Sequence, residues 1–193
     1  ITDLKLFSEK NKRVDDSPFG GGPGMIIKPD VIDKALLSLK ANDFPIYYLS
    51  PRGVKLDTQI SSSISKLEGI TLVCGKYEGV DERVIKHYNM IEISIGDYIL
   101  SGGDLAAMVL IDSVVRCLPN VLGNPLTLNE ETFTNHLLEY PLYTQPREWK
   151  NYKVPDVLLS GDHKKIKDWK IKQSEDITMK RRPDLWNRYL KLK

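Results

Sequence analysis

The chain has 193 residues, of which 41% are hydrophobic and 28% are charged. These values are typical of a globular protein with one large or two small domains, and no apolar run approaches the roughly 20 residues of a membrane-spanning helix. The two cysteines, Cys74 and Cys117, form no C-x-x-C pair, which favours a reducing, cytoplasmic compartment. The three histidines have no metal-ligand spacing, so no metal site is predicted from them. The chain begins with Ile1 rather than Met, and we expect further residues upstream.

The charge is unevenly distributed along the chain. Residues 150–193 hold 13 basic and 6 acidic residues, a balance of +7, whereas residues 1–149 have a balance of −5. A basic C-terminal part is typical of a domain that meets a polyanion, although a solvated helix face has the same composition. Charge alone leaves both interpretations open.

Strands and helices alternate through the first part of the chain, after a loop rich in glycine and proline at residues 11–25. Apolar periodicity and capping residues predict helices and short apolar runs predict strands. Such alternation indicates an α/β domain with a mostly parallel sheet. In chain order the expected elements are a helix at 30–41, a strand at 45–49 stopped by Ser50-Pro51-Arg52-Gly53, a helix at 57–67 capped by Asp57, a strand at 70–74, a helix at 81–87, a strand at 90–95 and a helix at 104–117.

The pattern changes after residue 118. Residues 119–160 are rich in proline, asparagine and threonine, and they include a short predicted helix at 130–138. An amphipathic, lysine-rich helix follows at 162–174, with Trp169 among its apolar residues, and a last helix is expected after Pro183. We therefore predict a second, small, helical and basic module.

Three predicted strands end in unusual loops, YLSPRG, CGKYEG and SIGDYILSGGD. Ligands of parallel sheets bind beyond the carboxyl ends of the strands, and glycine lets backbone approach a ligand closely. Tight turns are the simpler explanation for any one glycine pair. The chain lacks G-x-x-x-x-G-K-[ST] and a G-x-G-x-x-G that opens a helix, which argues against a nucleotide triphosphate. The coincidence of three loops favours a ligand with an adenosine-like or amino-acid-like part.

Arg116 ends an apolar helix, and Glu130 and Glu131 begin a short one. Each position also suits simple pairing of the side-chain charge with the helix dipole. Spacing alone does not decide between that role and catalysis.

Several long motifs resemble the bacterial tRNA (guanine-N1)-methyltransferase family, TrmD, in the same order along the chain. They are RVDDSPFGGGPGM, YYLSPRGVKLD, LVCGKYEGVDERV, SIGDYILSGGDLAAMVLIDSVVR, VLGN, LLEYPLYTQP and VPDVLLSGDHKKIKDWK. The resemblance implies a SPOUT fold, an α/β domain with a C-terminal trefoil knot, a rarity among protein topologies. It places a knotted cofactor-binding domain at residues 1–118, a linker at 119–134 and a basic helical tRNA-binding domain at 135–193.

The same resemblance implies a homodimer with active sites at the subunit interface. The enzyme would move a methyl group from S-adenosylmethionine to N1 of the guanosine just 3′ of the anticodon in tRNA, and magnesium is also implied. The cofactor would lie against backbone of the three loops. The residues implied in binding it are Tyr48, Leu49, Ser50, Pro51, Gly75, Tyr77, Glu78, Gly79, Ile95, Gly96, Asp97, Tyr98, Ile99, Leu100, Gly102 and Gly103.

The resemblance also assigns catalytic roles. The family pattern has an aspartate base where this chain has Glu131, one methylene longer, and Glu130 remains an alternative. Arg116 matches the family's catalytic arginine, and Glu78 is a candidate for positioning the cofactor or magnesium.

The basic module would hold RNA phosphates, and such binding weakens with salt. We expect this of Lys164, Lys165, Lys170, Lys172, Arg181 and Arg182. Trp169 either stacks on a base or packs in the core. Three other functions stay open: an RNA-binding protein without catalysis, a small-molecule enzyme, and a SPOUT methyltransferase with another RNA target.

Overall fold

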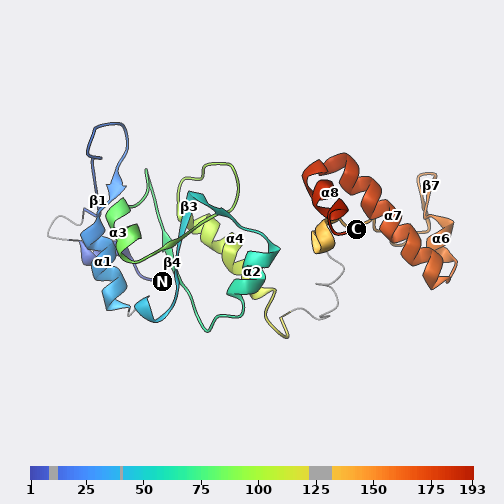
Figure 1. The fold of residues 1–193 in the computed structure, drawn as a ribbon, viewed down its shortest axis with the longest axis horizontal. Helices are drawn as coiled ribbons and strands as arrows, with labels where there is room; N and C mark the ends of the chain where they lie inside the picture. Colours follow the sequence, from blue (N-terminus) through green and yellow to red (C-terminus); the bar gives the residue numbers. More distant parts are fainter. Residues whose placement is uncertain (9–12, 40, 122–131) are drawn as a thin grey trace. The chain divides into compact units, whose positions relative to one another are not determined.

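A computed structural model describes residues 1–8, 13–39, 41–121 and 132–193. The chain divides into two compact units, Ile1–Val121 and Leu122–Lys193 (Figure 1). Among the described residues, no helix is long and apolar enough to cross a membrane.

A parallel sheet of three strands forms the centre of the first unit. β3 (Ile46–Lys55) lies between β4 (Thr71–Cys74) and β5 (Ile91–Ser94). Tyr47 is paired with Leu72 on one side and with Ile91 on the other. The predicted α/β class and the parallel direction of the strands are thereby confirmed.

Four helices cover the two faces of this sheet. α1 (Pro29–Ser38) and α3 (Glu82–His87) lie on one side, and α2 (Thr58–Ile64) and α4 (Gly103–Val115) on the other (Figure 1). Successive side chains of a strand point to opposite faces. Tyr48 accordingly packs in the core with α1 and α3, while Tyr47 and Leu49 pack in the core with α2 and α4. This two-sided burial explains why the first four residues of β3, at 46–49, are all apolar.

Local capping residues set where these helices begin. Asp57 accepts a hydrogen bond from the Ile60 backbone N–H, as predicted, and Asp81 accepts one from Arg83. Both carboxylates satisfy donors that the first helical turn leaves unpaired. Two short 3-10 helices, η1 (Leu4–Phe7) and η2 (Ala41–Asp43), complete the helical part of this unit.

The prediction that residues 50–53 stop the strand at Leu49 was wrong. β3 continues to Lys55, and Val54 and Lys55 pair with Ile93 and Ser94 of β5. Ile93 is also paired with Leu49, so β3 contacts β5 twice with an irregular stretch between the two pairings. At this irregularity Gly53 lies directly against the backbone of β5: a Cβ atom there would be 2.4 Å from the Glu92 carbonyl carbon and from the Ile93 nitrogen.

Gly53→Ala is therefore expected to destabilise the first unit by about 1–3 kcal/mol, the usual cost of overpacking. The clashing atoms belong to backbone, so no side-chain rotation relieves them. Urea denaturation monitored by circular dichroism measures the change. Gly102→Ser is the control, because a Cβ there would meet nothing closer than 3.6 Å and serine is a good N-cap for α4. Equal stability of the two variants would contradict the expectation.

The N-terminal loop contains a small antiparallel pair that the sequence did not reveal, β1 (Asp15–Asp16) with β2 (Ile26–Ile27). Backbone hydrogen bonds fasten this pair to the loop after β4. Glu78 N–H donates to Met25 O over 3.0 Å, and Ile27 N–H donates to Gly79 O over 2.9 Å. The glycine-rich loop is thus anchored beside one of the three strand-end loops.

The second unit is mainly helical. It contains η3 (Thr134–His136), a hairpin of β6 (Glu148–Trp149) and β7 (Tyr152–Lys153), and the helices α6 (Asp156–Leu159), α7 (His163–Arg181) and α8 (Pro183–Leu190). α7 is longer than the predicted 162–174. The expected helix at 130–138 begins outside the described residues. Within the described residues of that range, the helical segment is the 3-10 turn η3.

The centre of the second unit is partly polar. Thr178 is fully buried, donates its hydroxyl to Ser174 O over 2.6 Å and accepts the Leu138 N–H over 2.8 Å. The Tyr189 hydroxyl donates to Glu175 over 2.6 Å. These bonds satisfy groups that would otherwise be costly to bury, and they tie α7 to α8 and to the segment before the hairpin.

Candidate active site

Two of the three strand-end loops are joined directly at the carboxyl end of the sheet. Gly103 N–H donates to Gly75 O over 2.7 Å, and Lys76 and Gly102 form an antiparallel bridge. The third loop begins at Ser50, where the first pairing of β3 with β5 ends. Parallel strands bring their carboxyl ends to one edge, so the three loops lie at the edge where such sheets bind ligands.

Most glycines of these loops are required by packing of the chain itself. A Cβ on Gly75 would be 3.0 Å from the Tyr48 ring, and one on Gly103 would be 3.0 Å from the Cys74 Cα. Gly79 and Gly96 have φ of +110° and +154°, which L side chains rarely adopt. For these four positions the simple structural explanation is sufficient.

Gly102 is different. Its backbone is extended, with φ −178° and ψ 169°, a conformation open to any residue. A Cβ there would meet nothing closer than Gly75 O at 3.6 Å, so packing tolerates a side chain. Gly102 is also the N-cap of α4, a position that favours glycine over most residues. The open space around it makes it the position in the loops best suited to close approach by a ligand.

The loop after β5 is held at its base and exposed at its tip. Ser94 Oγ donates to Gly96 O over 3.1 Å and accepts the Gly96 N–H over 3.2 Å. Beyond this turn Asp97 forms an exposed ion pair with Lys55 at 3.6 Å. The three following side chains are apolar and exposed, and they are Tyr98, Ile99 and Leu100. The loop thus offers an apolar surface that nothing in the described part of the same chain covers.

The other two loops contain both buried and exposed side chains. The side chains of Tyr48, Leu49 and Ser50 are buried, and burial is the main reason why the pKa of the Tyr48 hydroxyl is raised. Tyr77 and Glu78 are exposed, and Tyr77 has a φ of 59°. Where the side chains are buried, at residues 48–50, polar recognition of a ligand would fall to backbone N–H and C=O groups, which suits recognition by neutral hydrogen bonds.

Arg52 was not identified from the sequence, yet it connects three elements of the site. Its Nη2 atom lies 3.2 Å from Glu82 Oε2 in α3 and 3.3 Å from Glu92 Oε2 in β5. These bonds, led by the one to Glu82, raise the pKa of the guanidinium. The partners are far along the chain, so no local motif could have predicted them.

Arg116, the catalytic arginine implied by the resemblance, is not brought to the loops of its own chain. Arg116 is the C-cap of α4, whose N-terminus carries Gly103. At 1.5 Å rise per residue, Arg116 lies about 20 Å along the helix from Gly103. Glu130 and Glu131 lie outside the described residues.

α4 carries an unusually apolar outer surface. Its exposed residues include Leu105, Met108, Val109, Ile111 and Val115. An apolar pocket adjoins this surface, and its lining includes Ile64, Ile70, Leu110, Ile111, Val114 and Leu118. Exposed apolar area of this extent beside a pocket is typical of a contact surface.

The predicted RNA-binding residues lie on α7 and at its end, but they do not share one face. Lys165 and Lys172 are seven residues apart and fall on one side, whereas Lys170 and Arg181, eleven apart, fall on another. Lys164, Lys165, Lys172 and Arg181 are exposed. The set therefore surrounds the helix.

Several of these residues have partners in the structure. Lys170 lies over the Tyr140 ring at 4.5 Å, and Lys165 pairs with Asp162 at 3.2 Å. Arg182 binds both carboxylate oxygens of Asp184 and lowers the pKa of that carboxyl to about 2. The Trp169 ring lies 6.3 Å from that of Tyr143, so it packs within the unit.

Comparison with known proteins identifies the family of the chain. The family model described as tRNA (Guanine-1)-methyltransferase TrmD matches residues 1–188. A protein of Pelagibacter ubique, named tRNA (guanine-N(1)-)-methyltransferase, is 54% identical over 99% of this chain and 86% of its own length. Proteins of the same name from Rhodospirillum rubrum and Ehrlichia canis are 51% and 50% identical, over 97% and 96% of this chain and 79% and 80% of their own lengths. The chain belongs to the TrmD family of tRNA (guanine-1)-methyltransferases.

Proposed function

We propose that this protein transfers the methyl group of S-adenosylmethionine to N1 of the guanosine immediately 3′ of the anticodon in tRNA. Membership in the TrmD family over almost the whole chain is the observation that carries this proposal. The joined glycine loops support it, because they lie at the edge where parallel sheets bind ligands and leave open space at Gly102.

The residues at this edge fit S-adenosylmethionine, which supplies an electrophilic methyl group on a sulfonium. Backbone N–H and C=O groups of residues 48–51, 75–79 and 95–103 would pair with the adenine edge. Exposed Tyr98, Ile99 and Leu100 would cover the bound molecule and exclude water. Glycine at Gly102 would let the ligand lie directly against the chain.

A base and a cation complete the reaction. Guanine N1 carries a proton that must be removed. As N1 bonds to the methyl carbon, the C–S bond of the sulfonium breaks and its electron pair stays on sulfur. We assign the removal of the N1 proton to the Glu131 carboxylate, with Glu130 as the alternative. Arg116 would donate hydrogen bonds to guanine O6, where negative charge develops as the proton leaves.

A homodimer would bring these groups together. Arg116 lies about 20 Å along α4 from Gly103, too far to serve loops of its own chain. The exposed apolar surface of α4 and the adjoining pocket support burial against a second copy. We propose that each active site takes its cofactor loops from one subunit and Arg116 from the other.

The proposed trefoil knot is supported by the double pairing of Ile93. A residue in a strand can pair with one neighbour on each side of the strand. Ile93 pairs in parallel with both Leu49 and Val54 of β3, which is accounted for if β3 crosses β5 between these two residues. The close approach of Gly53 to the backbone of Glu92 and Ile93 fits such a crossing. The knot would lie within the cofactor-binding domain at residues 1–118.

The second unit would hold the tRNA. We propose a linker at 119–134 and a tRNA-binding domain at 135–193, in a cytoplasmic protein. The target base must be turned out of the anticodon loop to reach the methyl group. Magnesium remains implied only by family resemblance: among the described residues, no group of His, Cys, Asp or Glu side chains could hold a metal ion, so we derive no step through it.

Transfer of labelled methyl from S-adenosylmethionine tests the proposal. Two tRNA transcripts that differ only in G or A just 3′ of the anticodon are compared. We expect label on the G transcript alone. Equal label on both would indicate another RNA target, and tRNA binding without transfer to either would indicate an RNA-binding protein without this activity.

A further inference from the structure

The second unit contains a tight hairpin that the predicted RNA-binding residues do not include. β6 and β7 are joined by Lys150 and Asn151, both with positive φ, 47° and 67°. Two such residues form the type I′ turn that suits two-residue hairpins. Val154 N–H donates to Arg147 O over 3.0 Å and closes the open end. We call residues 147–153 the aromatic hairpin.

Two large aromatic side chains of this hairpin are exposed. Trp149 is paired with Tyr152, so both lie on the same face of the ribbon. Their exposed fractions are 60% and 76%, which means that neither ring fills the core of the unit. Trp169 and Trp186, by contrast, are half-buried and lie against Tyr143 and Tyr189.

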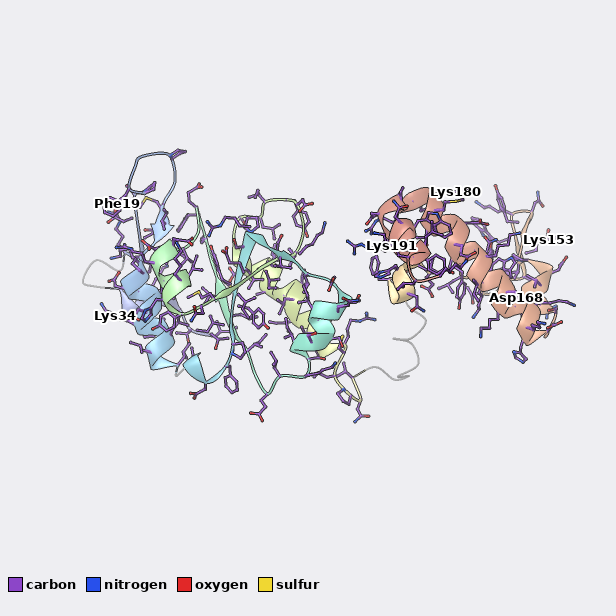
Figure 2. The ribbon with its side chains drawn as sticks, viewed as in Figure 1. Phe19, Lys34, Lys153, Asp168, Lys180 and Lys191 are labelled. Atoms are coloured by element: carbon purple, nitrogen blue, oxygen red, sulfur yellow. The ribbon has the colours of Figure 1, made fainter. Side chains whose placement is uncertain are left out.

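Positive charge surrounds these rings. The hairpin carries Arg147, Lys150 and Lys153 against one acid, Glu148. The Lys150 ammonium lies 4.9 Å from the centre of the Trp149 ring, and Lys153 pairs weakly with Glu148 at 3.8 Å. Figure 2 shows Lys153 at the end of the unit where α7 begins, away from Lys191 at the end of α8.

We propose that the aromatic hairpin is an RNA-contacting surface on which an unpaired base of the tRNA stacks, an inference that rests on the proposed function. Exposed aromatic faces next to cations are the features by which proteins hold single-stranded RNA. Trp149 and Tyr152 would together form the face on which the base stacks, and Lys150 and Lys153 would hold the phosphates beside it. The +7 balance of residues 150–193 favours a polyanion over a protein partner.

Binding of a tRNA transcript by the purified protein, measured by fluorescence anisotropy across a salt series, tests this surface. Trp149→Ala and Tyr152→Ala are each expected to weaken binding by about 5- to 150-fold, the range measured for loss of one stacked base. Trp149→Phe should retain most of the affinity. Leu142→Ala removes an apolar side chain that is 68% exposed outside the hairpin, and it should bind as the unmodified protein does.

The salt dependence separates stacking from charge. Lys153→Ala should reduce the slope of log K against log salt by about 1, while Trp149→Ala should leave the slope unchanged. A protein with Trp169→Phe and Trp186→Phe reports on Trp149 alone, and tRNA should quench its fluorescence. This second readout does not depend on whether Trp149→Ala disturbs the hairpin.

Unchanged affinity in Trp149→Ala and Tyr152→Ala, together with no quenching of Trp149, would overturn the inference while the unmodified protein still methylates tRNA. Loss of dimer rather than of tRNA affinity would make the hairpin a protein contact and would equally overturn it. If the unmodified protein neither binds nor methylates tRNA, the proposed function fails and the inference fails with it.

Discussion

Replacement of Glu131 by Gln is expected to lower the rate of methyl transfer by about 10²- to 10⁴-fold, the usual contribution of a general base. The amide keeps the size of the side chain but cannot accept the N1 proton of guanine. Binding of S-adenosylmethionine should be unchanged, since the cofactor loops are left intact. Single-turnover transfer to the tRNA transcript with G 3′ of the anticodon, together with calorimetric titration of the cofactor, measures the two effects separately.

Glu130→Gln is the matched control, because it removes the same charge from the neighbouring position. We expect it to retain most of the activity. The opposite result, full activity in Glu131→Gln and loss in Glu130→Gln, would move the base to Glu130. The family has aspartate where this chain has Glu131, whose side chain is one methylene longer. Glu131→Asp therefore tests how far the carboxylate must reach, since its distance to N1 must be correct within about an ångström.

Arg116→Ala is expected to reduce transfer by about 10²- to 10³-fold, the cost of losing one donor to a developing oxyanion. Arg116→Lys should restore little, because an ammonium lacks the planar fork of the guanidinium. The cofactor should bind normally, since we assign Arg116 to guanine O6 and not to the cofactor loops. Transfer kinetics at saturating tRNA measure this loss.

Mixing two inactive variants tests whether Arg116 acts across the subunit interface. In a dimer of one Glu131→Gln subunit and one Arg116→Ala subunit, one site receives both intact residues if they come from different subunits. Equal mixing and reassociation should then restore about a quarter of the original activity, since half of the dimers are mixed and each has one active site. No recovery, with mixed dimers shown to form, would place both residues in the same subunit.

Local signals predicted the first unit well. The Asp57 cap, the apolar periodicity of α1 and the uninterrupted apolar strand at 46–49 each reflect interactions within a few residues of chain. The prediction that the strand ends at Leu49 was wrong, although proline and glycine, here Pro51 and Gly53, usually end a strand. Here β3 resumes pairing after them, and the reason lies in β5, some 40 residues away.

The aromatic hairpin was missed for a different reason. Its turn residues, Lys150 and Asn151, lack the glycine that marks most type I′ turns, and its strands are two residues long. The flanking Trp149 and Tyr152, both strand formers, were the only local signal. A short hairpin within a proline-rich stretch therefore has the sequence signature of a linker.

The sequence by itself determined the α/β class, the basic C-terminal part and the family, because composition, periodicity and long motifs are properties of the chain alone. Only the tertiary structure decided which glycines are explained by packing, since that depends on Tyr48 and Cys74 lying against Gly75 and Gly103. It also decided the Arg52 bonds to Glu82 and Glu92, and the separation of Arg116 from the loops. Such features depend on contacts between residues 27 or more apart in the chain or on the length of a helix, and no local pattern encodes those contacts.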